Sequence, residues 1–173
     1  MKKIILLLTV VAAFVIQGCE GPEGPQGPVG PPGDTISAVY EFQNVSFSYN
    51  STDGYVFYRQ IPGMYQSDVM LIYRMNGTVN STTPIWQQIP RTLYLPQGEL
   101  DYDFDFTRTD FNIYAGGNYD LSLTPAYLTN QTFRVVIVPG YFANKGGKSV
   151  DYSDYNAVIK AYNIDDSKVK VLR

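Results

Sequence analysis

The chain contains no histidine and only one cysteine among its 173 residues. Histidine is the side chain that most often accepts and donates protons near neutral pH, and it is a frequent ligand of metal ions. The single cysteine, Cys19, has no partner within the chain for a disulfide. These absences exclude imidazole-activated nucleophiles and most zinc sites, so we expect a protein that is not an enzyme and has no cofactor.

Positive charge is also scarce. The chain has 13 lysines and arginines against 16 aspartates and glutamates, and its basic residues form no cluster. Nucleic acids and anionic lipid headgroups are usually bound by clustered lysines and arginines. We therefore expect no nucleic-acid partner. The length and a hydrophobic content of 45% suit one globular domain with appendages.

The N-terminus has the three parts of a secretory signal: Lys2 and Lys3, an apolar run over 4–16, and a small residue, Gly18, before Cys19. The run is shorter than the roughly 20 residues that a helix needs to cross a bilayer. Residues 16–19 resemble a lipobox, which implies cleavage between Gly18 and Cys19 and attachment of fatty acyl chains such as palmitate to Cys19. Several acyl chains anchor a protein firmly. The alternative is an unmodified cysteine in a secreted protein.

Five strict triplets with glycine in every third place follow, from Gly21 to Thr35, and four of them have proline second. Only glycine fits at the axis of three intertwined polyproline strands, so the period is typical of a collagen-like segment. Two interpretations stay open, a single-chain extended spacer and a homotrimeric stalk. At about 3.1 Å per residue, either would span roughly 45 Å.

From residue 36 onward, short runs rich in Tyr, Phe, Val, Ile and Thr alternate with turn dipeptides such as Asp53-Gly54 and Gln97-Gly98. This pattern predicts an all-β fold, an antiparallel β-sandwich or barrel of roughly eight to ten short strands. The expected strands are 36–42, 45–49, 55–61, 68–75, 85–89, 92–95, 100–106, 111–114, 119–124, 132–138 and 168–172. Turns are also expected at Asn76-Gly77 and Gly116-Gly117. Apolar residues at helical spacing over 155–162, after the potential N-cap Asp154, predict one short helix near the C-terminus.

Three acidic residues alternate with three aromatic ones over 101–106. On a strand, this period places Asp101, Asp103 and Asp105 on one face and the aromatic side chains on the other. The carboxylates are a candidate cation site, although the spacing does not match an EF-hand loop. The alternative is a solvated strand face with its aromatic residues in the core.

Aromatic residues are the second candidate feature, since the chain has 15 tyrosines, 9 phenylalanines and one tryptophan. Exposed aromatic side chains suit contacts with carbohydrate or protein, whereas most of those in a small all-β domain build its core. Trp86, Tyr141 and Phe142 are the candidate ligand contacts. Separately, residues 34–36 resemble the short acidic-Thr-apolar acceptor for O-glycosylation of exported proteins in Bacteroidota, which makes Thr35 a possible glycosylation site.

The lipobox Cys19, the Gly-Pro triplets directly after it, a Tyr-rich β domain and the stretch 100–107 together resemble the collagen-like-repeat surface lipoproteins of Bacteroidota. The resemblance implies attachment to the outer membrane and exposure at the cell surface, but no activity. We expect a signal peptide over 1–18, a lipidated cysteine and linker over 19–35, and a β-sandwich over 36–173. The expected function is structural or adhesive, and the alternative is a glycan- or cation-binding module.

Overall fold

A computed structural model describes residues 38–140 and 150–172. The chain divides into two units, Met1–Gly33 and Asp34–Arg173, and all described residues belong to the second. Among these residues, no helix is long and apolar enough to cross a membrane.

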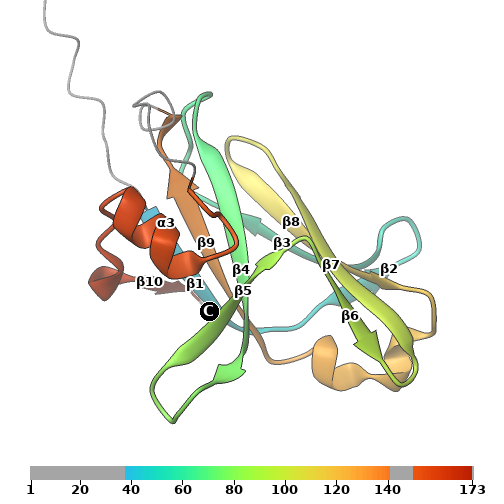
Figure 1. The fold of residues 1–173 in the computed structure, drawn as a ribbon. Coiled ribbons are helices and arrows are strands. Elements are labelled where there is room, and N and C mark those ends of the chain that lie inside the picture. The colour runs from blue at the N-terminus through green and yellow to red at the C-terminus, as the bar shows by residue number, and fades with distance from the viewer. Residues whose placement is uncertain (1–37, 141–149, 173) are drawn as a thin grey trace, which may run out of the picture. The chain divides into compact units, whose positions relative to one another are not determined.

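The described part of the chain forms a β-sandwich, which confirms the predicted fold class (Figure 1). One sheet has the strand order β10-β1-β9-β4-β5, and the other has the order β2-β3-β8-β7-β6. The strands are β1 (Ala38–Val45), β2 (Ser48–Asn50), β3 (Gly54–Gln60), β4 (Val69–Thr78), β5 (Pro84–Ile89), β6 (Arg91–Leu95), β7 (Gly98–Phe106), β8 (Asp110–Gly117), β9 (Gln131–Val138) and β10 (Lys170–Leu172).

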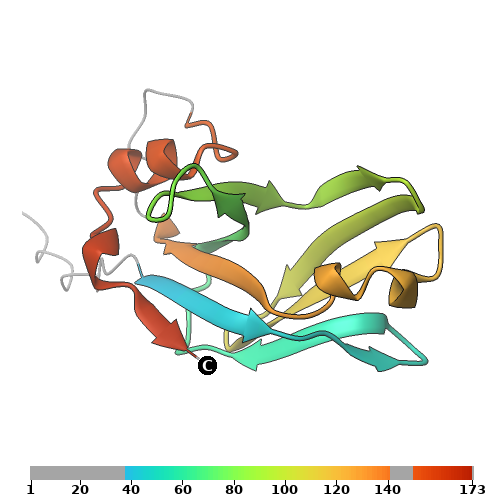
Figure 2. The same cartoon turned by 90° about the horizontal axis from the view of Figure 1, so that it is seen from below.

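Nearly all neighbouring strands are antiparallel. Short connections join four of these pairs, β2–β3, β4–β5, β6–β7 and β7–β8, whereas the other three bring together strands distant in sequence. The exception to the antiparallel arrangement is the pair formed by the first and last described strands. β10 runs parallel to β1 at the edge of its sheet, with Tyr40 opposite Lys170 and Phe42 opposite Leu172. Figure 2 shows β10 beside β1 and the two sheets facing one another. The last described strand therefore adds to the sheet that contains the first described strand.

The core between the sheets is aromatic. Phe42 and Phe57 contact each other edge to face, with ring centroids 6.0 Å apart, and Phe111 lies 5.3 Å from Phe42. Phe133 contributes from β9 and is fully buried. Edge-to-face contacts of this kind add to the stabilisation that the buried apolar area already supplies.

A second hydrophobic layer covers the outer face of the β1 sheet. It lies under the short helix α3 (Tyr155–Ala161), which confirms the predicted C-terminal helix (Figure 1). Val158 of α3 and Ile164 pack against the strand residues Val136 and Val138. Because β9 is covered on both faces, its run from Val135 to Val138 is apolar without alternation. The Asp154 carboxylate caps the helix by accepting hydrogen bonds from the N–H groups of Asn156 and Ala157.

The strand predicted over 119–124 is wrong. The chain there forms two 3-10 helices, η1 (Leu121–Leu123) and η2 (Pro125–Tyr127). The Asp120 side chain accepts a hydrogen bond from the Ser122 N–H, and Pro125 starts the second turn. The alternating leucines do not indicate a strand, because Leu121 is buried while Leu123 is 66% exposed.

The turns predicted at Asn76-Gly77 and Gly116-Gly117 are also wrong. Gly77 has a φ of 116° and lies inside β4, where the pairing with β5 shifts register. The chain reverses only beyond Thr78, where the Asn80 side chain accepts hydrogen bonds from the Thr82 and Thr83 N–H groups. Gly117 ends β8, and a Cβ there would lie 2.5 Å from the Glu99 carbonyl oxygen, so the glycine permits close strand packing.

Candidate functional site

A pocket of about 490 Å³ opens on the outer side of the β1 sheet. Its walls come from the β4–β5 hairpin, β9, the start of α3 and the 3-10 helix η3 (Asp166–Lys168). We call it the Trp86 pocket. The residues that define its chemistry are one tryptophan, one tyrosine, one arginine, one amide and two carboxylates: Trp86, Tyr155, Arg134, Asn156, Asp154 and Asp166.

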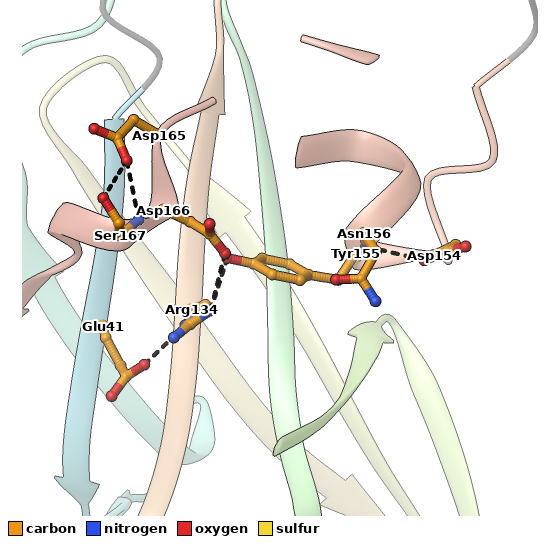
Figure 3. A network of polar contacts seen from close by, with 8 residues as sticks. All are labelled: Glu41, Arg134, Asp154, Tyr155, Asn156, Asp165, Asp166 and Ser167. Carbon is orange, nitrogen blue, oxygen red and sulfur yellow. Dashed lines mark hydrogen bonds and ion pairs between the residues drawn. The ribbon is translucent and has the colours of Figure 1, made fainter. Parts of the chain in front are cut away.

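Arg134 is the centre of the polar network behind this pocket. Its Nε donates to Glu41 Oε2 over 2.8 Å, and its Nη1 donates to the Tyr155 hydroxyl over 2.7 Å. Figure 3 shows the guanidinium between Glu41 on one side and Tyr155 with Asp166 on the other. The side chains of Arg134 and Glu41 are only 16% and 11% exposed. Four segments distant in sequence are thereby joined through a single cation.

The Tyr155 hydroxyl connects Arg134 to Asp166 of η3 through hydrogen bonds. It accepts from Arg134 and donates to Asp166 Oδ2 over 2.9 Å, and Arg134 Nη1 lies 3.7 Å from the same oxygen. Burial raises the pKa of Tyr155 above its usual value, and the hydrogen bond to Asp166 raises it further, while Arg134 acts in the opposite direction. The hydroxyl therefore stays protonated at physiological pH and works as a fixed donor rather than as a base.

The aromatic rings form one side of the pocket. The Arg134 guanidinium carbon lies 4.4 Å from the centre of the Trp86 ring, and the Trp86 and Tyr155 rings are 5.8 Å apart at 40°. A cation above an aromatic face is attracted by the negative charge of the ring's π system. Trp86 is half-buried, so the indole is held in place and still contributes surface to the pocket.

Strand periodicity explains why these side chains meet. On β9, Phe133 and Val135 enter the core between the sheets, so Arg134 faces outward beneath α3. Arg134 is the single charged residue of this strand. Trp86 occupies an outward position of β5 by the same alternation, and the Asp154 cap fixes where the helix begins and thus where Tyr155 projects.

The second candidate surface lies on the other sheet, where Asp101, Asp103 and Asp105 of β7 face away from the core. Asp105 accepts hydrogen bonds from Asn112 Nδ2 over 2.9 Å and from the Tyr114 hydroxyl over 2.8 Å. Burial, together with this bond to Asp105, raises the pKa of Tyr114 to about 12. The Asp103 carboxylate binds the adjacent N–H of Phe104.

Two of the three carboxylates of this acidic strand, Asp103 and Asp105, have local hydrogen-bond partners on their own sheet. Within the residues that the structure describes, no three acidic or sulfur side chains are placed to hold a metal ion. The aromatic residues between the carboxylates differ in burial, since Tyr102 is fully buried and Phe106 is 42% exposed. The cation site at Asp101, Asp103 and Asp105 thus gains no support from the arrangement of these side chains.

Of the other predicted site residues, Trp86 is the one that the structure places in a pocket. Tyr141, Phe142, Gly18, Cys19 and Thr35 lie outside the described residues.

Sequence reasoning missed Arg134, Tyr155 and Asp166. The sequence does carry a signal for Arg134, because it is the single charged residue of a largely apolar strand and a buried charge needs a partner. It also missed the most exposed aromatic side chain of the described residues, Tyr94 on the edge strand β6, which is 80% exposed.

Together, the fold and the pocket define a β-sandwich with a preformed polar and aromatic cavity beside a helix that covers one sheet. No protein-family model, curated protein or solved structure matches the chain.

Proposed function

We propose that this chain is a lipid-anchored protein of the outer membrane with a structural or adhesive role, and that the β-sandwich is its contact-making head. The observation that carries the proposal is the order of the parts. The Gly-x-y triplets end at Thr35, and the first strand of the sandwich begins at Ala38. Acyl chains on Cys19 would hold the protein in the membrane while the triplets extend the head away from it.

The properties of the head support an adhesive role. Its hydrophobic core is buried between the two sheets, and its second hydrophobic layer is buried beneath α3. Most of the buried residues lie outside the Trp86 pocket, while Tyr155 and Trp86 both line the pocket and pack in the second layer. A cavity that is present before a partner arrives needs little ordering on binding, which favours affinity.

Membrane anchoring is tested by producing the full-length chain in a Gram-negative host. The wild-type chain is expected to partition into the detergent phase and to carry a fatty-acylated N-terminal residue by mass spectrometry. A Cys19→Ser variant is expected in the aqueous phase. An unmodified wild-type chain that partitions like the variant would contradict the anchor.

Surface exposure is tested on the same cells by adding protease to intact bacteria. The wild-type head is expected to be removed, while a periplasmic marker protein stays intact. Protection of the head in intact cells, with digestion only after lysis, would place it in the periplasm and refute the surface role.

The state of the stalk is tested by the molar mass of the chain from residue 20 onward, measured by light scattering beside a version without residues 21–35. A trimer that requires the triplets would give the head avidity for a repetitive surface. If both versions are monomers, the triplets act only as a single-chain spacer.

A further inference from the structure

We propose that the Trp86 pocket binds a saccharide, and specifically a neutral or positively charged sugar rather than an acidic one. This inference deepens the proposed adhesive function and relies on it only for the display of the pocket at the cell surface. The binding chemistry itself depends on residues that the structure describes.

The size and composition of the pocket favour a small ligand. Its volume of about 490 Å³ lies within the range of roughly 300–1,000 Å³ that small-molecule sites occupy. Such sites combine aromatic surface with a few well-placed polar groups. Here Trp86 and Tyr155 supply the aromatic surface, and Asn156 and Asp166 supply polar groups from two different segments.

Several polar atoms of the lining remain available to a ligand. Asp166 uses Oδ2 for Tyr155 and Arg134, while its Oδ1 accepts no hydrogen bond from a described residue. Within the same set of residues, the Asn156 side-chain amide and the Trp86 indole N–H also make no hydrogen bond. A carboxylate oxygen, an amide and an N–H donor suit adjacent sugar hydroxyls, which both donate and accept.

The aromatic side of the pocket complements the other part of a sugar. Pyranose rings present C–H groups on their flat faces, and these pack against the electron-rich faces of aromatic rings. The Arg134 guanidinium lies 4.4 Å from the centre of the Trp86 ring and Tyr155 packs beside it, so the indole is oriented before a ligand arrives. A sugar would pack against the ring face that Arg134 does not cover. A fixed platform lowers the entropy lost on binding.

The charge around the pocket determines which sugars fit. Asp154 and Asp166 lie in the lining with one cation, Arg134, and Arg134 is already paired with Glu41 behind the pocket. The excess of carboxylates disfavours uronic acids and other anionic sugars, because like charges repel across a partly desolvated site. The sugars whose charge suits the pocket are hexoses, N-acetylhexosamines and protonated hexosamines.

Trp86 also makes the test direct, because it is the only tryptophan in the chain. The full-length protein in mild detergent is titrated with glucose and N-acetylglucosamine trisaccharides, with glucosamine, and with glucuronate. Trp86 fluorescence and isothermal calorimetry are recorded for each. We expect saturable binding of a neutral or amino sugar with a dissociation constant of about 1 mM, a shift of the emission, and at least tenfold weaker binding of glucuronate.

Two variants test the location. Asn156→Ala removes an amide of the lining and leaves the Arg134 network intact, so we expect at least a fivefold loss of affinity. Tyr94→Ala removes a larger, aromatic side chain that is 80% exposed on β6 and away from the pocket, and it is expected to leave the affinity unchanged. Circular dichroism checks that both variants fold.

Three results would overturn the inference: no saturable binding by either method up to tens of millimolar, stronger binding of glucuronate than of neutral sugars, or undiminished affinity in Asn156→Ala. A lipidated, surface-exposed chain that binds none of these sugars would refute the saccharide site and leave the proposed function standing. A chain that binds sugar but is not anchored in the membrane would refute the proposed function and leave the saccharide site standing.

Discussion

Replacing Arg134 tests whether its contacts with Glu41 and Trp86 stabilise the side of the sandwich that α3 covers. In Arg134→Met, Glu41 loses the guanidinium that lies 2.8 Å from its carboxylate, while both side chains are buried by more than four-fifths. Removing one partner of a buried ion pair costs about 3–5 kcal/mol. The lost cation–π contact with Trp86 adds about 0.5–2 kcal/mol. Because some solvent reaches the pair, we expect a total of about 3–4 kcal/mol.

Urea-induced unfolding followed by far-UV circular dichroism measures this change. With a slope of about 2 kcal/mol per molar urea, the midpoint is expected to fall by about 1.5–2 M. Arg91→Met, which removes an exposed arginine on β6, is the matched control and is expected to change the free energy of unfolding by less than about 0.5 kcal/mol.

A double-mutant cycle separates the pair from its surroundings. Glu41→Gln keeps the shape of the side chain and removes its charge, so the double variant Glu41→Gln with Arg134→Met no longer buries an unpaired carboxylate. We expect the double variant to be more stable than the sum of the single changes predicts, by about 1–3 kcal/mol. Additive effects, or a single loss no larger than that of Arg91→Met, would refute the view that Arg134 stabilises this side through Glu41.

Three further predictions concern other parts of the domain. Burial raises the pKa of Tyr102 to about 12; because an unfolded tyrosine ionises near 10, stability is full below pH 10 and declines by about 2–3 kcal/mol as the pH rises to about 12. Urea midpoints across this range should fall more steeply for wild type than for Tyr102→Phe. Phe111→Ala, which empties a fully buried position, should cost about 3–5 kcal/mol in the same assay, against less than 1 kcal/mol for exposed Phe106→Ala. Asp154→Ala removes the cap of α3 and should cost about 0.5–2 kcal/mol; an unchanged midpoint would contradict the capping role.

Most of the sandwich could be predicted from the sequence, because its strands are marked by a period that depends only on local geometry. β7 illustrates this, since Leu100 and Tyr102 are buried while Asp103 and Asp105 are exposed. The helix was predictable for the same reason, through its spacing and its Asp154 cap. Tyr119–Thr124 has the alternation of a strand as well, but an isolated strand needs a neighbour, and no local pattern shows whether one is available.

The pocket was far less predictable. Trp86, the single tryptophan, was predicted as a candidate ligand contact. Its partner Arg134 is 48 positions further along the chain, and Asp166 lies beyond the helix. Pairing between them depends on β9 lying between β1 and β4, an order that follows from long-range contacts rather than from neighbouring residues. The Asn-Gly pair at 76–77 was ambiguous as well, because it lies where the pairing of β4 with β5 shifts register and does not form a turn.

The position of β1 determines how the domain would respond to mechanical force. β1 is the first described strand, and it lies between β9 and β10 with paired neighbours on both sides. Hydrogen bonds run perpendicular to the strands in an antiparallel pair such as β1–β9 and are slanted in a parallel pair such as β1–β10. A tether that pulls along β1 therefore loads those bonds simultaneously in shear, whereas a strand pulled sideways at an edge would be peeled away one bond at a time. Tension that arrives from the preceding segment thus falls first on an interior strand of the sheet.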